Sequence, residues 1–418
     1  MMDQRRRQPS QQPRAGRPRH PEVVQPADRR PPAALVAVKR LFAAETGNYF
    51  LLLGTTLFLV VFGLVMVLSS SAVTSYTESD DFFRGFERQG LFVLLGVPLM
   101  LLASRMPAVF WKKWAGLAMI IGISLQFLTV ATPLGYSVNG NTNWIAIGSF
   151  SMQPSEVVKL GLVIWLGSVL AQKQYSLDNW KEAALPVGPI AGIAIGFVLL
   201  GKDLGTAIIL TAIVLGALFF AGVRLRHLAV VVAAIAVAGA GLAVATLSRQ
   251  NRIEVWQNGC ALAKDYETDC WQTVHGWWAL ASGGVFGVGL GNSKAKWNWL
   301  PEADNDFIFA IIGEELGLLG AVLVLVLFVV LAISFVRIIR ANPDPFAKIT
   351  VSAVMVWIIG QAFVNIVVVL GVLPVLGVPL PLMSSGGTAL ISGLVAIGIA
   401  LSFARQSVSD VSQRQPAR

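Results

Sequence analysis

The sequence predicts an all-α polytopic membrane protein with about ten transmembrane helices and one large extracytoplasmic loop. Hydrophobic residues make up 55% of the 418 residues, charged residues only 13%, and the mean hydropathy is +0.68. Because a soluble domain carries about 25% charged residues, the composition excludes an ordinary soluble protein. Apolar runs of about 20 residues, the length that a membrane span requires, recur along the chain.

These runs predict the individual helices. The expected ranges are 49–69, 89–105, 114–132, 154–172, 186–200, 203–221, 226–247, 307–336, 348–372 and 386–404. Only Gly201 and Lys202 separate the fifth from the sixth, which leaves either a tight turn or a break within the membrane. The helices define a transmembrane domain at 45–405, with the large loop at 248–305.

The two chain ends differ in composition from this domain. Residues 1–40 contain ten Lys and Arg, three Asp and Glu, and seven of the 20 prolines, so 1–44 is predicted to be a disordered basic cytoplasmic tail. Contact of this tail with anionic lipid is favoured over nucleic-acid binding, and no nucleic-acid partner is expected. Residues 406–418 are predicted to form a short cytoplasmic tail.

The charges of the segments between the helices predict the orientation of the chain in the membrane. Cytoplasmic connections attract Lys and Arg, and alternate connections contain Arg105, Lys112, Lys113, Lys173, Lys181, Arg224, Arg226, Arg337, Arg340 and Lys348, with Arg405 at the end of the last helix. The connection at 133–153 has no Lys or Arg. We therefore expect both termini to be cytoplasmic.

Five carboxylates gather at the end of the large loop and the start of the next helix: Glu302, Asp304, Asp306, Glu314 and Glu315. Carboxylates at the edge of the hydrocarbon are costly to keep charged, which makes them candidates for chemistry. A structural alternative for Asp306 is a helix cap or first-turn acid. Glu314 is eight residues further on, so we expect it on roughly the same helix face.

Three other segments carry polar groups into apolar surroundings. Lys159 lies about one turn into a predicted helix, where it either snorkels to the interface or faces a cavity beside Glu156. Asp203 follows Lys202, and a structural ion pair at this turn is the plain interpretation. Residues 374–388 contain three prolines and three glycines, and such irregular backbone survives in a membrane only inside protein or along a cavity.

The large loop has its own pattern. Cys260 and Cys270 are the two cysteines and are expected to form a disulfide outside the cytoplasm. The histidines do not cluster, and no metal site is predicted from them. Half of the 12 tryptophans lie here, and an interfacial belt is favoured over a substrate groove: Trp256, Trp271, Trp277, Trp278, Trp297 and Trp299. Gly287–Ser293 lacks the lysine of a nucleotide-binding loop.

The motifs taken together resemble one family over roughly 45–405. In chain order they are Gln153–Lys159, Asp203–Ala207, Gly289–Ser293, Leu300–Glu302, Asp306–Ala310 with Gly313–Glu315, and Leu373–Pro381 with Gly386 and Gly387. This order resembles the SEDS family (shape, elongation, division and sporulation), the peptidoglycan glycosyltransferases typified by FtsW and RodA. The residues at Gly63–Ser71 look more like the division type.

The resemblance implies polymerisation of lipid II at the outer face of the bacterial cytoplasmic membrane, at the division septum. Asp306 matches the essential aspartate, Glu314 a nearby important acid, and Trp144 the tryptophan after the third helix. Glu156 and Lys159 match the charged motif of the fourth helix. Further substrate-binding or supporting candidates are Asp203, Glu302, Asp304, Ser385 and Gly386. The implied partners are a class B penicillin-binding protein, which is a transpeptidase, and other division proteins.

The chain also departs from the family pattern. Asp304-Asn305 replaces the usual His-Thr, and Gly201-Lys202 the usual Gln-Pro. Thr142-Asn143 replaces a small and a basic residue, while Ser385 replaces an aromatic residue. These changes concern contacts with the substrate more than the reaction.

In the expected mechanism, Asp306 is the general base for the attacking sugar hydroxyl. Lys159, Lys202 or a divalent cation, Mg²⁺ or Mn²⁺, balances the departing pyrophosphate. Two alternatives from other classes are a lipid II flippase or transporter and a non-catalytic scaffold of the division machinery.

Overall fold

The computed structural model describes residues 47–414, except 139, 149, 178, 244–249, 251–252, 255, 261–269 and 298. The predicted tail at 1–44 therefore lies outside the described residues, as does part of the loop at 248–305. The described residues belong to one compact unit, Ala44–Arg418.

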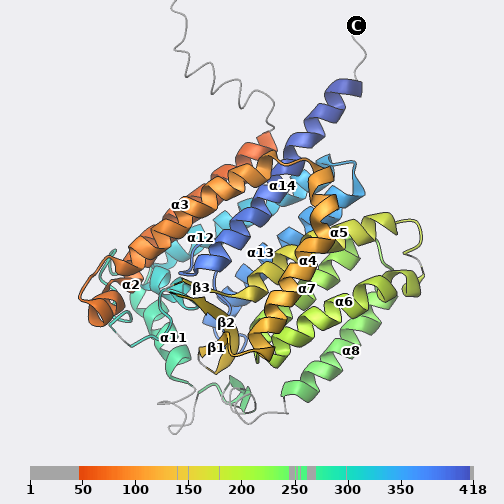
Figure 1. Cartoon of the computed structure of the whole chain (residues 1–418). Coiled ribbons are helices and arrows are strands. Elements are labelled where there is room, and N and C mark those ends of the chain that lie inside the picture. Colours follow the sequence, from red (N-terminus) through yellow and green to blue (C-terminus); the bar gives the residue numbers. More distant parts are fainter. Residues whose placement is uncertain are drawn as a thin grey trace, which may run out of the picture. The chain divides into compact units, whose positions relative to one another are not determined.

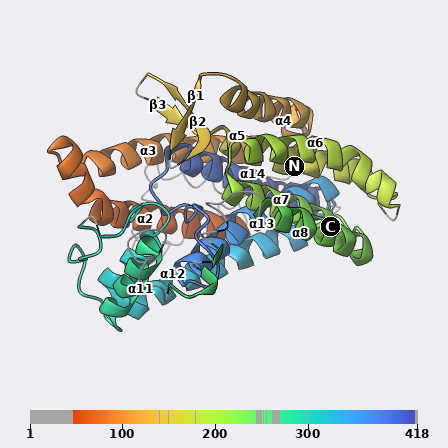
Figure 2. The same cartoon turned by 90° about the horizontal axis from the view of Figure 1, so that it is seen from below.

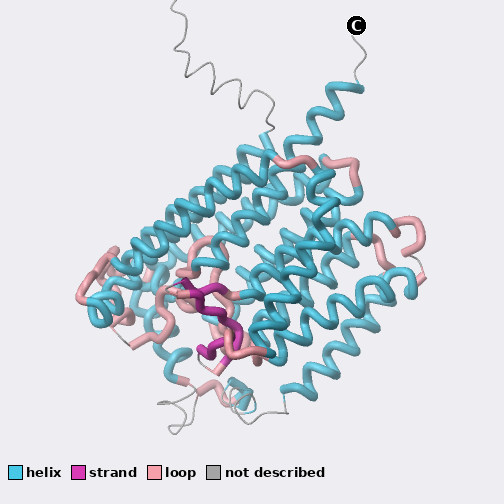
Figure 3. The backbone as a smooth tube through the Cα atoms, viewed as in Figure 1, coloured by secondary structure: helices cyan, strands magenta, loops and turns pink. Residues whose placement is uncertain are grey.

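Within the described residues, helices account for nearly all of the bundle (Figures 1 and 3). The long ones are α2 (Gly47–Ser79), α3 (Arg84–Arg105), α4 (Ala108–Ala131), α5 (Pro154–Gln172), α6 (Trp180–Leu200), α7 (Leu204–Phe220), α8 (Leu225–Ala243), α12 (Ile308–Ala341), α13 (Pro345–Val369) and α14 (Gly387–Arg414). Of these described helices, seven are long and apolar enough to cross a membrane, and α6, α7 and α8 contain shorter apolar stretches. The predicted polytopic all-α fold is confirmed.

The connection between α4 and α5 is a small sheet, which the sequence did not predict. Strands β1 (Gly135–Val138), β2 (Asn141–Ile147) and β3 (Phe150–Met152) pair antiparallel in the order β1-β2-β3. In this register Trp144 lies opposite Tyr136. Figure 2 shows the bundle from the end at which this sheet lies, with the sheet at one edge and helix α11 (Trp271–Gly283) beside α12 at the other. We call this side of the bundle the sheet end.

Local sequence signals explain several helix boundaries. Asp203 caps α7, Asn179 caps α6, and Asp344 caps α13 immediately before Pro345, as expected for Asn, Asp and proline at helix starts. Between α6 and α7 the chain makes a tight turn in which Lys202 has a φ of 66°, so the structure favours the turn over a break. Helix α14 continues to Arg414, ten residues beyond its predicted end at 404.

Close helix contacts draw the starts of several helices to the sheet end. A Cβ on Gly161 of α5 would lie 2.8 Å from the carbonyl oxygen of Ala118 in α4, and one on Gly398 of α14 would lie 2.4 Å from that of Met100 in α3. Small residues permit such close approach of membrane helices. The starts of α5, α7 and α14 and the segment that leads into α12 line the same cavity at this end.

Candidate active site

A cavity of about 200 Å³ lies where these helices begin. Its wall contains eight of the predicted site residues: Trp144, Glu156, Lys159, Asp203, Glu302, Asp306, Ser385 and Gly386. Residues far apart in the sequence are thus brought to one place by β2, α5, α7, the turn before α12 and the start of α14. Asp304 and Glu314 are not among the residues that line it.

Asp306 lies in the turn before α12 and is partly exposed as a residue. Its Oδ1 atom is buried and has no hydrogen-bond partner within the part of the chain that the structure describes. Burial, followed by the negative charges of Glu302, Asp203 and Asp304, raises the pKa of Asp306 to about 7. The helix-capping alternative for Asp306 is wrong, because Phe307 occupies the N-cap position of α12.

The backbone around Asp306 is clamped to the segment that the three prolines make irregular. Asn365 of α13 donates from Nδ2 to the carbonyl oxygens of Asp306 and Val378, each at 2.7 Å. The Ser384 hydroxyl donates to the Asn305 carbonyl at 2.7 Å, and the Ser385 amide to that of Asp304 at 2.8 Å. The irregular backbone predicted for 374–388 is therefore observed and forms part of the cavity wall.

Sequence reasoning missed this clamp. Gln361 and Asn365 are one turn apart in an otherwise apolar helix, and polar side chains at such depth normally face the bundle interior or a cavity. Gln361 donates to the Pro379 carbonyl at 2.9 Å, so both amides of α13 hold the same proline-rich segment. The spacing of these two amides was the sequence signal that could have identified them.

Replacing Asn365 with Ala is expected to lower the kcat of the polymerisation that the family resemblance implies by roughly tenfold to a hundredfold, because it displaces Asp306, the expected general base. Steady-state kinetics of the purified variant measures this. Asn342→Ala is the matched control, since Asn342 is also buried and donates to a carbonyl, that of Phe403 at 2.9 Å. Equal effects of both substitutions would contradict a positioning role for Asn365.

Lys159 and Glu156 form a buried ion pair at the cavity wall. Lys159 Nζ lies 2.7 Å from Glu156 Oε1, and both side chains are 3% exposed. Lys159 also donates to Gln361 Oε1 at 3.1 Å, and Ser392 donates to Glu156 Oε2 at 3.0 Å. Lys159 therefore faces the cavity instead of snorkelling, and its charge is already neutralised by Glu156.

Asp203 combines a structural and a cavity position. Its Oδ1 accepts from the Thr206 amide at 2.8 Å, and Oδ2 accepts from the Thr206 hydroxyl at 2.7 Å. Gln153 Nε2 donates to the same carboxylate at 3.4 Å. Burial raises the pKa of Asp203, and the bonds from Thr206 oppose this. These contacts hold the Asp203 carboxylate. The ion pair expected between Asp203 and Lys202 is not present among the described residues.

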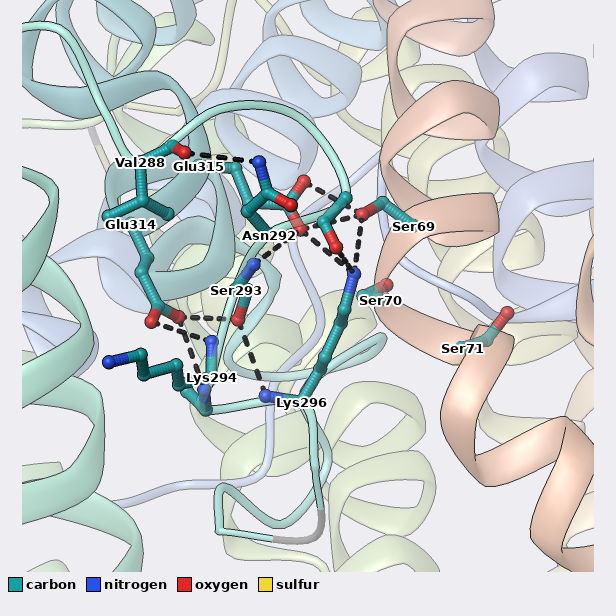
Figure 4. Close-up of polar contacts among 12 residues, drawn as sticks. Ser69, Ser70, Ser71, Val288, Asn292, Ser293, Lys294, Lys296, Glu314 and Glu315 are labelled. Carbon is teal, nitrogen blue, oxygen red and sulfur yellow. Dashed lines mark hydrogen bonds and ion pairs between the residues drawn. The ribbon is translucent and has the colours of Figure 1, made fainter.

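Glu314 and Glu315 belong to a second polar cluster, shown in Figure 4. Glu314 Oε1 accepts from the Lys294 amide at 2.9 Å, and its Oε2 accepts from the Ser293 hydroxyl. Glu315 Oε1 lies 3.2 Å from Lys296 Nζ, and both of its oxygens accept from Ser69 Oγ of α2 at 2.6 and 2.7 Å. We call Ser69, Ser293, Lys296, Glu314 and Glu315 the brace.

The brace corrects one expectation. Glu314 does not share a face with Asp306, because Asp306 precedes the first turn of α12 and only Glu314 lies within the helix. Both brace carboxylates are almost fully buried and hold residues 293–296 against α12. Glu314 thus contacts a loop and does not line the cavity, and the role that the family resemblance implies for it stays a prediction.

The backbone of α12 is interrupted beside the brace. Gly317 has φ 67° and ψ −162°, which is not helical. The carbonyls of Glu314 and Glu315 instead accept from the Val288 and Gly289 amides at 2.9 and 3.0 Å. The Leu318 and Leu319 amides donate to the Gly284 and Val285 carbonyls at 2.9 and 3.2 Å.

The glycine-rich segment 283–291 therefore fills the break in α12 and satisfies its free backbone groups, as membrane depth requires. Gly287 has a φ of 81°, and a Cβ there would lie 2.1 Å from the Glu315 carbonyl oxygen. These glycines serve backbone packing, which agrees with the absence of a nucleotide-binding signature in the sequence.

The tryptophans of the large loop lie outside the cavity wall. Trp271 and Trp299 stack at 5.9 Å with His275 beside them, and Trp256 Nε1 donates to the Gly371 carbonyl at 3.1 Å. Gln272 of α11 lines the cavity instead. A disulfide joins Cys260 and Cys270.

The described residues contain no group of three or more His, Cys, Asp or Glu side chains placed to hold a metal ion. The Mg²⁺ or Mn²⁺ expected from the sequence therefore stays a prediction.

The fold and the site define a class, namely a multi-pass helical membrane protein with an acidic cavity at one end of the bundle. Residues 49–409 match the family model FTSW_RODA_SPOVE, described as cell cycle protein. The chain belongs to this family, as the SEDS motifs predicted.

Similar proteins agree with the family. The chain is 37% identical over 371 residues to "Probable peptidoglycan glycosyltransferase FtsW" of Mycobacterium tuberculosis, which covers 89% of this chain and 70% of that protein. It is 35% identical over 364 residues to "Stage V sporulation protein E" of Bacillus subtilis, which covers 87% of this chain and 98% of that one. The fold matches Thermus thermophilus RodA with a TM-score of 0.63 at 24% identity, covering 85% of this chain and 96% of that chain.

Proposed function

We propose that this protein is a peptidoglycan glycosyltransferase that polymerises lipid II into glycan strands during cell division. The observation that carries this proposal is the cavity itself, where Asp306 lies beside the matched motif residues and its Oδ1 atom is buried without a hydrogen-bond partner among the described residues. The named relatives with this activity are 33–37% identical over most of the chain. The proposed place of reaction is the outer face of the cytoplasmic membrane at the septum, with both termini cytoplasmic.

In the proposed reaction, a hydroxyl of the acceptor sugar attacks the anomeric carbon of the donor. A bond forms between that oxygen and carbon, and the bond from the carbon to the pyrophosphate oxygen breaks. The hydroxyl proton passes to Asp306, and polyprenyl pyrophosphate leaves. A base with a pKa near the working pH accepts such a proton efficiently, and burial among acids supplies this property.

The proposed partner is a class B penicillin-binding protein, in company with other division proteins. The experiment that tests the function is polymerisation of lipid II by the purified protein, with and without this partner, next to a transport assay in vesicles. Glycan strands from the wild type support the glycosyltransferase. Movement of lipid II across the vesicle membrane without strands would favour a flippase, and neither result would favour a scaffold.

The rate of polymerisation is expected to rise with pH and to level off above about pH 7. Asp306 is active as a base only when it is deprotonated, and burial raises its pKa to about 7, so the active fraction grows as the pH passes this value. A profile of kcat/KM from pH 5 to 9 measures this. A rate that is flat between pH 5 and 7 would contradict the assignment of the base.

The raised pKa of Asp306 also affects the stability of the fold, and this effect has the opposite sign to the effect on the rate. The folded protein binds the Asp306 proton more tightly than the unfolded chain does, so this residue lowers the free energy of unfolding as the pH rises from about 4 to about 7. Activity and stability therefore change in opposite directions over this range.

A further inference from the structure

Asn143 of β2 lies next to Trp144 and lines the cavity. The residue is 1% exposed, and neither its Nδ2 nor its Oδ1 has a hydrogen-bond partner among the residues that the structure describes. Buried amide groups are almost always hydrogen-bonded, because burial without a partner is costly. An amide in this state beside a cavity has a donor and an acceptor that neither the described residues nor solvent satisfies, which makes it a candidate binding group.

The surrounding backbone holds this amide in place. The Thr142 amide donates to the Gly201 carbonyl at 2.9 Å, which joins β2 to the turn between α6 and α7. A Cβ on Gly201 would lie 2.0 Å from Asn143 Oδ1, so only glycine leaves room for the side chain. Asn143 and Gly201 are two positions at which the chain departs from the SEDS pattern, and in the structure one departure accommodates the other.

The charges of the cavity restrict what binds beside Asn143. The lining contains four acids, Glu156, Asp203, Glu302 and Asp306, and one cation, Lys159, which Glu156 already neutralises. This balance disfavours an anionic group directly beside Asn143. The remaining polar lining is neutral and consists mainly of amides and hydroxyls, among them Gln153, Thr206 and Gln272.

The size of the cavity restricts the ligand further. Its volume of about 200 Å³ is below the roughly 300–1,000 Å³ of pockets that enclose a whole drug-sized ligand. It therefore takes only part of a lipid-linked disaccharide, and that part is neutral, polar and within reach of Asp306. A sugar ring of the acceptor meets these conditions.

We infer that Asn143 recognises the acetamido group of the sugar that enters the cavity, donating from Nδ2 to the acetyl oxygen and accepting the amide N–H at Oδ1. A secondary amide is the group that satisfies both orphan atoms at once. This inference rests on the proposed function and adds a specificity-determining residue to it. The peptide bonds of the lipid II stem share this chemistry, so the experiment must separate the two sources.

The test uses the purified full-length protein in detergent and three ligands: lipid II, an analogue with hydroxyls in place of both acetamido groups, and lipid II without its stem peptide. Dissociation constants from calorimetry and polymerisation rates are both measured. Wild type is expected to bind lipid II at least about tenfold more tightly than the hydroxyl analogue, since a site built to hydrogen-bond a group rejects the ligand that lacks it. Removal of the stem is expected to leave this preference intact.

Asn143→Leu is expected to lose the preference while binding the hydroxyl analogue as wild type does. Gln126→Leu is the matched control, because Gln126 of α4 is also a fully buried amide whose two polar atoms lack partners among the described residues, yet it does not line the cavity. This variant is expected to keep the preference. If Asn143→Leu does not fold, Asn143→Ala takes its place, and Gly201→Ala, which displaces the amide, is expected to weaken the preference as well.

The possible outcomes separate the two proposals. An unchanged preference in Asn143→Leu, or a preference that follows the stem peptide, overturns the inference and leaves polymerisation by the wild type standing. A wild type that shows the preference in binding but makes no glycan strands, with or without the transpeptidase partner, overturns the proposed function while the amide contact stands.

Discussion

Asp306→Asn is expected to reduce lipid II polymerisation by about 10²–10⁴-fold, the usual contribution of a general base. Asparagine keeps the size of the side chain but does not accept a proton near neutral pH. Substrate affinity is expected to change little, because the loss concerns proton transfer. The measurement is the initial rate of strand formation by the variant in the presence of the transpeptidase partner.

Asp304→Asn is the comparison that gives this result its meaning. Asp304 precedes Asp306 by two residues, does not line the cavity, and contributes to the raised pKa of Asp306 through its charge. Its replacement is therefore expected to cause a smaller loss and to move the pH profile of the rate toward lower pH. A larger loss from Asp304→Asn than from Asp306→Asn would move the base to Asp304.

Lys296→Met is expected to lower the free energy of unfolding by about 3–5 kcal/mol, because it leaves the Glu315 carboxylate buried without its cationic partner. Lys296 is 6% exposed and Glu315 is fully buried. Unfolding of the detergent-solubilised protein by heat or denaturant measures the change. The double variant with Glu315→Gln is expected to recover most of the loss, since the unpaired charge is then removed as well.

A surface ion pair supplies the control. Lys112 Nζ lies 3.4 Å from the Asp344 carboxylate, with side chains 45% and 36% exposed, and such pairs contribute about 0–1 kcal/mol. Lys112→Met is therefore expected to have little effect. If Lys296→Met costs no more than Lys112→Met, the brace does not stabilise the fold through its charges.

The helices and most of the cavity wall were predictable for identifiable reasons. Length and hydropathy mark each membrane helix, and the motif residues Glu156, Asp203 and Asp306 converge because each stands at the start of a helix that begins at the sheet end. The proline-rich segment was recognisable because proline and glycine exclude a straight helix.

Other features had no distinct signal in the sequence. Gly317 breaks α12, yet glycine is frequent in membrane helices and does not mark a break by itself. Glu314 points to a loop that precedes it in the chain, and helical periodicity describes only contacts within one helix. The position of the Asn143 amide depends on its contact with Gly201, which joins strand β2 to the turn between α6 and α7.

The interruption of α12 bears on how this helix enters the bilayer during synthesis. Leu318–Ala341 alone extends roughly 35 Å at 1.5 Å per residue, enough for a hydrocarbon core of about 30 Å. An acidic residue at the centre of an inserting helix adds about 2.5–3.5 kcal/mol to the cost of insertion. Because the break at Gly317 follows Glu314 and Glu315, both acids stay out of the segment that must partition into lipid, and protein from the loop at 283–297 surrounds them instead.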